Sequence, residues 1–323
     1  MMSKMGAGLM AIVMSFGCAE EPDVALAQDE QAIVVPRELI AMTTITLPNG
    51  DTADVFAPIV PRRLQHAFED AFPVVVHLQG AVVGRSSYRG FGRELARHGF
   101  VVVIPDHLRA FGPPGTPPVP FTEANVVGAA TAAIAALDAD ASSPLHLVAD
   151  MQRVGISGHS FGGVVAMQLL GGSCSPPFCT PPFGLPAEVG AIAVYGTHLA
   201  QPAGVIDINT RGVGVALLRG DLDGRAAPSK IEATYGVLDD ARALITIHGA
   251  NHFGICDSAA PAGAEPDPSS QTLDQAASVR ATATWAGRWF RDRLHVDPVA
   301  GLWLYGLGGS LDGVVTVDAA EEM

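Results

Sequence analysis

The sequence predicts an α/β fold: a mostly parallel sheet of eight strands with helices on both faces and no large lid domain. Short, continuous apolar segments such as Val74–Leu78 and Phe100–Pro105 alternate along the chain with longer helix-like segments. Continuous apolar runs are typical of strands buried on both faces of a parallel sheet. Repeated strand–helix units of this kind predict a doubly wound sheet with right-handed crossovers.

The first two strands alternate more between apolar and polar residues, and we expect them to form an antiparallel edge hairpin that turns near Asn49 and Gly50. The expected strands are Thr43–Leu47, Asp54–Pro58, Val74–Leu78, Phe100–Pro105, Arg153–Ser157, Ala191–Tyr195, Val213–Leu218 and Leu244–His248. The expected helices are Ser87–His98, Glu123–Asp138, Phe161–Leu170, Pro228–Asp239 and Leu273–Leu294.

Composition indicates one large folded domain. Of the 323 residues, 48% are apolar and only 16% are charged, which is ample material for a large core. A net charge of −14 argues against nucleic acid as a partner, because an acidic surface repels phosphates. We expect a linker over residues 19–40, a single domain over residues 41–304, and a poorly ordered tail over residues 305–323.

Residues 1–18 have the pattern of an export signal, because Lys4 precedes an apolar stretch, Gly6–Gly17, that is too short to span a bilayer. Two cleavage interpretations stay open. Ser15–Cys18 resembles a bacterial lipobox, which would place a lipidated Cys18 at the mature N-terminus and attach the protein to a membrane. Ala25–Ala27 offers an alternative cleavage site. We therefore expect an exported protein: periplasmic, a membrane-anchored lipoprotein or extracellular.

The segment Gly158–Gly162 matches the pattern G-x-S-x-G, with Ser160 at its centre. It directly follows an expected strand and begins an expected helix, which is the context that a nucleophilic serine requires. A sharp turn with strained backbone angles exposes the serine and needs small residues on either side. The helix N-terminus then offers N–H groups and a positive dipole end to a developing oxyanion. Ser160 is therefore the predicted nucleophile.

Loops after the last two expected strands contain candidates for a general base and its orienting acid. His248 ends a strand, whereas His252 lies four residues further on in the loop, which favours His252 as the base. Asp221 stands at a strand edge, whereas Asp223 lies further into its loop and is followed by Gly224, which favours Asp223 as the acid.

An oxyanion hole needs two backbone donors. The N–H of Phe161, directly after the nucleophile, is one candidate. The N–H of Ala81 is the other, because it follows the third expected strand, where Gly80 permits a turn. With these groups the mechanism requires neither a metal nor an organic cofactor.

The chain resembles one branch of the α/β-hydrolase superfamily, the branch of serine esterases that contains chlorophyllases, platelet-activating-factor acetylhydrolases and bacterial cutinase-like polyesterases. The resemblance covers about residues 42–300, and the order Ser160, Asp223, His252 is that of this fold. The chain departs from the family at Gln79–Gly80, where the family usually has the residues His-Gly. The segments that carry it are Val74–Gly80, Tyr88, Leu95–His107, Gly158–Gly163 and Gly249–Phe253.

The resemblance implies hydrolysis of carboxylic esters, whether small molecules, lipids or polymers. Alternatives are a lipid deacylase or short-chain lipase with the same triad, and a catalytically inactive binding module of the same fold. The connection Gly196–Gly212 is too short for a cap domain, so we expect an open site. A Pro-rich loop lies at Phe111–Pro120, and another loop, Pro261–Ser270, precedes the last helix.

Among the four cysteines, Cys174 and Cys179 are close enough in sequence for a small disulfide, and Cys256 is expected to be a buried free thiol. Phe111, Phe121 and Phe253 are candidate apolar residues for the wall of the site.

Overall fold

The computed structural model describes residues 34–172, 179, 183–239 and 241–321. The expected export signal with Cys18 and Ala27, and most of the expected linker, lie outside the described residues. So does Cys174, whereas Cys179 is buried and disulfide-bonded. Cys256 is a buried free thiol, as expected. Among the described helices, none combines the length and apolar character needed to cross a membrane.

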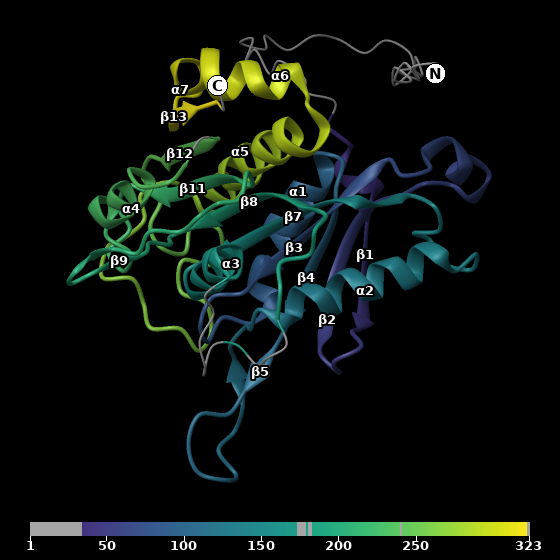
Figure 1. Cartoon of the computed structure of the whole chain (residues 1–323), viewed down its shortest axis with the longest axis horizontal. Helices are drawn as coiled ribbons and strands as arrows, with labels where there is room; N and C mark the ends of the chain where they lie inside the picture. Colours follow the sequence, from purple (N-terminus) through teal and green to yellow (C-terminus); the bar gives the residue numbers. More distant parts are fainter. Residues whose placement is uncertain (1–33, 173–178, 180–182, 240, 322–323) are drawn as a thin grey trace, which may run out of the picture. The chain divides into compact units, whose positions relative to one another are not determined.

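The domain is built on a nine-stranded sheet, in which β3, β4, β7, β8, β11 and β12 are parallel to one another (Figure 1). The strands β1 and β2 form the predicted antiparallel hairpin at one edge. The strand order is β1-β2-β4-β3-β7-β8-β11-β12-β13. The bounds are β1 Ile40–Thr46, β2 Thr52–Pro58, β3 Phe72–Leu78, β4 Val101–Asp106, β7 Ala149–His159, β8 Val189–Tyr195, β11 Gly214–Gly220, β12 Arg242–Ile247 and β13 Val315–Ala320.

Helices cover both faces of the sheet, as predicted. The helices α2, α3 and α4 pack on one face, and α1 and α5 pack on the other (Figure 1). Side chains alternate between the two cores along a single strand: Val74 and Val76 face the α2 side, and Val75 faces the α1 side. This alternation explains why the run Val74–Val76 is apolar throughout. The bounds are α1 Arg89–Arg97, α2 Asn125–Ala139, α3 Phe161–Gly171, α4 Pro228–Tyr235 and α5 Gln275–His295.

The C-terminal segment differs from the prediction. Residues 305–323 were expected to be a poorly ordered tail and the sheet to have eight strands, but Val315–Ala320 forms β13 and pairs antiparallel with β12 over its whole length. The helices α6 (Pro298–Gly301) and α7 (Gly308–Leu311), with the π-helical turn η4 (Leu302–Leu307) between them, lead the chain back to this edge. Pairing satisfies backbone groups along the edge of β12 that would otherwise be open.

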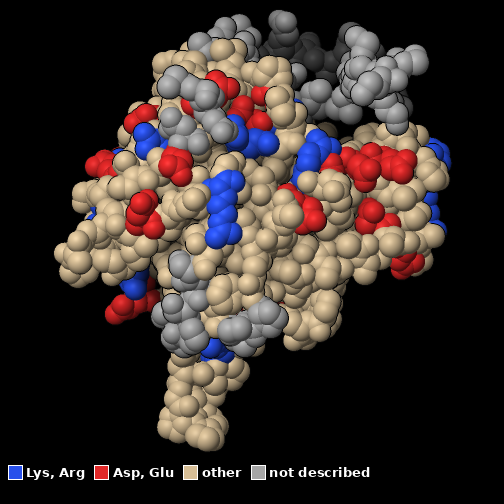
Figure 2. Space-filling view, in the orientation of Figure 1, with Lys and Arg blue, Asp and Glu red and all other residues tan. Residues whose placement is uncertain are grey.

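The Pro-rich loop after β4 forms a short hairpin, with strands β5 (Leu108–Arg109) and β6 (Val119–Pro120). It projects from the body of the domain (Figure 1). Figure 2 shows charged side chains spread over the visible body of the domain, whereas the projection carries almost none beyond its base. The sequence between Arg109 and Glu123 contains no charged residue, which agrees with this view.

Candidate active site

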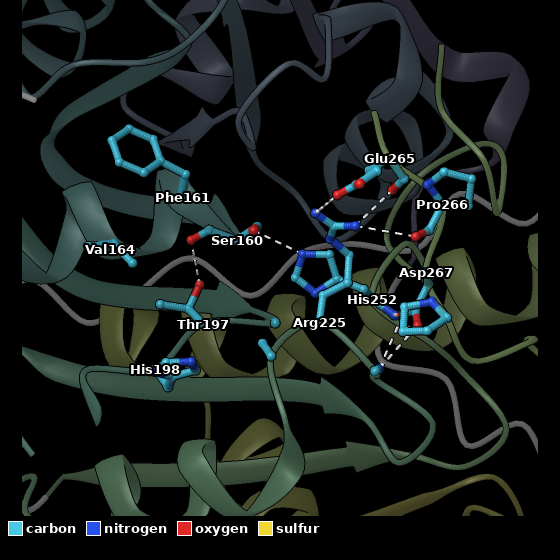
Figure 3. Close-up of a pocket in the computed structure, with 14 residues that line it drawn as sticks. Ser160, Phe161, Val164, Thr197, His198, Arg225, His252, Glu265, Pro266 and Asp267 are labelled. Atoms are coloured by element: carbon cyan, nitrogen blue, oxygen red, sulfur yellow. Dashed lines mark hydrogen bonds and ion pairs between the residues drawn. The ribbon is translucent and has the colours of Figure 1, made fainter. Parts of the chain in front are cut away.

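The predicted site residues meet at one edge of the sheet, where the parallel strands β3, β7, β11 and β12 end. Ser160 follows β7, Asp223 follows β11, and His252 follows β12. The carboxyl edge of an open α/β sheet is the usual position for a binding site, because loops from neighbouring strands converge there. Figure 3 shows these loops around a common pocket.

Ser160 stands on a strained turn between β7 and α3. Its φ of 50° and ψ of −117° lie in a region that residues with a side chain rarely adopt. The Thr197 hydroxyl donates a hydrogen bond of 2.9 Å to the Ser160 carbonyl and holds the turn (Figure 3). A Cβ on Gly162 would overlap the backbone carbonyl oxygen of Leu78, and one on Gly158 would lie 2.8 Å from the backbone of Gly163. Both motif glycines are therefore required by close backbone approach.

Gly162→Ala is expected to destabilise the fold by about 1–3 kcal/mol or more, because backbone atoms of β3 cannot move aside without disturbing the sheet. Gly128→Ala is the matched control. Gly128 also lies in a helix, but a Cβ there meets nothing within 4 Å. The control should stabilise the protein by about 0.4–1 kcal/mol. Urea unfolding measures both changes, and equal stability of the two variants would contradict the close approach at Gly162.

Ser160, His252 and Asp223 form one hydrogen-bonded chain. His252 Nε2 lies 2.9 Å from Ser160 Oγ, and His252 Nδ1 lies 2.9 Å from Asp223 Oδ2 and 3.1 Å from Oδ1. Both His252 and Asp223 are only 3% exposed. A carboxylate can only accept, so Nδ1 carries the proton and Nε2 is left to accept a hydrogen bond from the serine hydroxyl. This is the tautomer that a general base acting on Ser160 needs.

Hydrogen bonds from backbone N–H groups hold the Asp223 carboxylate in place. Asp223 Oδ1 accepts hydrogen bonds from the N–H groups of Arg225 (2.9 Å) and Ala226 (2.7 Å). Gly196, at a φ of +60°, lies against the pair: a Cβ there would be 2.9 Å from His252 Nδ1 and 3.1 Å from Asp223 Oδ2. The contact between imidazole and carboxylate therefore depends on a glycine at the end of β8.

The rival candidates form a separate pair. His248 Nδ1 lies 3.0 Å from Asp221 Oδ2, and both side chains are exposed at 45% and 38% respectively. Asp221 Oδ1 also accepts a hydrogen bond of 2.7 Å from the N–H of Gly249. Among the described residues, the hydrogen-bonded chain from Ser160 contains His252 and Asp223, whereas His248 and Asp221 form a pair of their own.

Asp267 is a residue of the site that the sequence did not indicate. Its carboxylate accepts hydrogen bonds from the backbone N–H groups of His252 (2.8 Å), Gly224 (3.2 Å) and Ser269 (2.7 Å). It therefore ties the loop that carries Asp223 to the loop that carries His252. The only sequence signal was an aspartate in a Pro-rich loop, and such a residue is usually a turn former.

The site is open and consists of two cavities of about 840 and 550 Å³. Phe161 lines the larger cavity and Ala81 lines the smaller one, and Ser160 lines both. Phe253 lines the smaller cavity, whereas Phe111 and Phe121 line neither. The residues common to both cavities are Ser160, Arg225, His252, Glu265 and Pro266.

Arg225 and the loop that contains Glu265 form the partition between the cavities. The Arg225 guanidinium donates to the Glu265 and Pro266 carbonyls, at 3.1 and 3.2 Å, and pairs with the Glu265 carboxylate at 3.3 Å (Figure 3). The connection between β8 and β11 contains only the short hairpin of β9 (Ala200–Gln201) and β10 (Gly204–Val205). Across the described residues, no group of three or more His, Cys, Asp or Glu side chains is arranged to hold a metal ion.

The strand order, the helices on both faces and the serine on a turn after β7 define the α/β-hydrolase fold. The chlorophyllase family model matches residues 58–180, which include the loop at Gly80–Ala81 and the serine motif but end before Asp223 and His252. The resemblance to the chlorophyllase branch is thereby confirmed, and the chain is a hydrolase of the α/β-hydrolase type. No curated protein matches the chain.

Proposed function

We propose that the protein is a serine hydrolase that cleaves carboxylic esters through an acyl-enzyme. The observation that supports this most directly is the hydrogen-bonded chain from Ser160 Oγ through His252 to Asp223. A neutral imidazole whose far nitrogen is held by a buried carboxylate can accept the serine proton as the oxygen attacks an ester carbonyl.

Each group has a defined role in this proposal. Ser160 attacks the carbonyl while His252 takes its proton, and the imidazolium then protonates the departing alcohol. Water, activated by the same imidazole, hydrolyses the acyl-enzyme and regenerates Ser160. The N–H groups of Phe161 and Ala81 stabilise the oxyanion that forms in each half of the reaction.

A fluorophosphonate probe tests the proposal directly, because it reacts with a serine only when a base and an oxyanion site activate it. Labelling of Ser160, located by peptide mass spectrometry, together with turnover of p-nitrophenyl esters, would support it. A folded protein that neither reacts with the probe nor turns over any ester would instead favour the inactive binding module. A lipid and a polyester tested after the soluble esters separate an esterase from a lipid deacylase.

Asp223→Asn is expected to reduce kcat by up to about 10⁴-fold, because an amide stabilises the imidazole tautomer with its proton on the wrong nitrogen. Asp221→Asn is the matched control, since this carboxylate pairs with the exposed His248 and with the backbone N–H of Gly249. The kcat values of both variants should be measured together with their thermal melts, so that a loss of activity can be distinguished from a loss of stability. A larger loss of kcat in the Asp221 variant at unchanged Tm would exchange the two roles.

We also propose that the protein is exported, because Lys4 and the apolar stretch after it form the pattern of a signal peptide. A lipidated Cys18 would place the esterase at a membrane surface, and cleavage after Ala27 would release it. The mass of the mature N-terminal peptide distinguishes these two forms.

A further inference from the structure

Behind the serine, a second chain of hydrogen bonds connects the oxyanion loop to the base loop. The Gly80 N–H donates to the Tyr88 hydroxyl at 2.9 Å, and this hydroxyl lies 2.9 Å from His159 Nδ1. His159 Nε2 lies 2.9 Å from the carbonyl oxygen of His252. Tyr88 and His159 are fully buried. The chain runs through the residue that precedes the nucleophile, a position that the G-x-S-x-G pattern leaves open.

The direction of every bond in this chain follows from the groups at its ends. The His252 carbonyl can only accept, so His159 Nε2 carries a proton and donates it. Burial, and then the nearby His252, lower the pKa of His159 well below its usual value. His159 is therefore neutral, and its Nδ1 accepts from the Tyr88 hydroxyl. The Tyr88 oxygen in turn accepts from the Gly80 N–H.

Neighbouring residues pack closely against this chain of hydrogen bonds. His77 lies against Tyr88 with ring centroids 4.4 Å apart, and its own Nδ1 is 3.1 Å from Ser157 Oγ. A Cβ on Gly80 would lie 2.8 Å from His159 Nδ1 and 3.2 Å from the Tyr88 hydroxyl. Gly80 is thus required not by a positive φ but by the close approach of the two side chains that hold it.

We propose that Tyr88 and His159 are positioning residues for ester hydrolysis, which set the oxyanion loop at Gly80–Ala81 in register with the base at His252. The inference rests on the proposed function. The two loops follow strands β3 and β12, which are not neighbours in the sheet. The chain through Tyr88 and His159 links the two loops and thereby fixes the position of the donor relative to the base.

The position of this chain predicts which kinetic parameter should change when the chain is broken. A displaced oxyanion donor weakens stabilisation of the transition state more than binding of the ground-state ester, since the oxyanion exists only along the reaction path. Misplacement of about 1 Å in a catalytic group can cost roughly 100-fold. Losses from this chain should therefore fall on kcat rather than on KM.

Tyr88→Phe removes the hydroxyl and keeps the ring. We expect kcat per active site to fall about 10- to 100-fold, with KM within about twofold of the wild type. Active sites are counted by titration with a fluorophosphonate. A trifluoromethyl ketone, which forms an oxyanion on the serine, should lose affinity in parallel with kcat/KM. A purely structural role would lower Tm and the number of titratable sites but leave the rate per site unchanged.

Tyr195→Phe is the matched control. Tyr195 is also buried, but its hydroxyl donates a hydrogen bond of 2.6 Å to the Asn251 carbonyl and is not a member of the chain from Gly80 to His252. It should therefore affect ketone affinity much less than Tyr88→Phe does.

His159→Asn provides a second variant. The Asn side-chain oxygen can lie near the position of Nδ1 and accept a hydrogen bond from Tyr88, while the bond to the His252 carbonyl is lost. This variant should retain more ketone affinity than Tyr88→Phe.

Because His159 is neutral, loss of its bond to Tyr88 should not change which group limits activity at low pH. In a plot of kcat/KM against pH, the Tyr88→Phe variant should therefore fall off at the same pH as the wild type but reach a lower plateau. An unchanged kcat per site in Tyr88→Phe, or an equal loss of ketone affinity in Tyr195→Phe, would overturn the inference. If the wild type itself neither hydrolyses esters nor reacts with the fluorophosphonate, the proposed function fails instead.

Discussion

Ser160→Ala is expected to abolish ester hydrolysis, with kcat reduced by roughly 10⁴- to 10⁶-fold. In the proposed mechanism Ser160 Oγ, which lies 2.9 Å from His252 Nε2, forms the acyl-enzyme bond, so the substitution removes the nucleophile. The fold should be retained, because alanine is smaller than serine and the bond that holds the turn, from Thr197, reaches the backbone carbonyl. Initial rates with p-nitrophenyl esters beside a thermal melt measure both effects.

An exposed serine supplies the control for this experiment. Ser258→Ala changes the same side chain in a loop outside both cavities and should leave the rate unaltered. Fluorophosphonate labelling should disappear in the Ser160 variant alone. A Ser160→Ala protein that is folded and hydrolyses esters at rates near the wild type would exclude Ser160 as the nucleophile.

His252→Ala is expected to reduce kcat by a similar factor, roughly 10⁴- to 10⁶-fold, because no other group in the described site can accept the proton of Ser160. His248→Ala is a matched change in the same loop region. Its imidazole is exposed and pairs with Asp221, so its removal should change kcat less than about twofold. If both variants are folded and the His248 variant has the larger defect, the base is assigned wrongly.

The double variant Ser160→Ala/His252→Ala adds a separate check on the same assignment. When two residues act in the same catalytic step, the losses in kcat from removing each one do not add, since the base cannot assist catalysis once its nucleophile is removed. The double variant should therefore be no slower than either single variant, within experimental precision. Multiplied losses would mean that the two side chains act in independent ways.

Elements with strong local patterns were predictable from the sequence. The parallel strands could be recognised because burial on both faces favours consecutive apolar residues, as Val74, Val75 and Val76 show. The turn at Ser160 could be recognised because close backbone contact leaves only glycine at Gly158 and Gly162. In these places a local physical requirement restricts which residue can stand at each position.

Elements that depend on distant partners were not predictable. Val315–Ala320 is short and ends in Asp318, Ala319 and Ala320, residue types that are depleted in strands. It becomes β13 because the edge of β12 offers it a backbone partner. Asp267 looks like an ordinary turn residue until folding brings it to the N–H groups of Gly224 and His252. Single-sequence patterns carry no information about such pairings, because they arise from the way the whole sheet is assembled.

The sequence by itself determined the fold class, the turn that exposes Ser160 and a choice of two acids and two bases, since each of these follows from local periodicity, backbone sterics or loop position. Only the tertiary structure decided how those candidates pair. It placed the buried side chains of His252 and Asp223 together with the serine and left Asp221 with His248 at the surface. It also joined Gly80, Tyr88, His159 and His252, because hydrogen bonds between loops depend on distances in space that spacing along the chain does not specify.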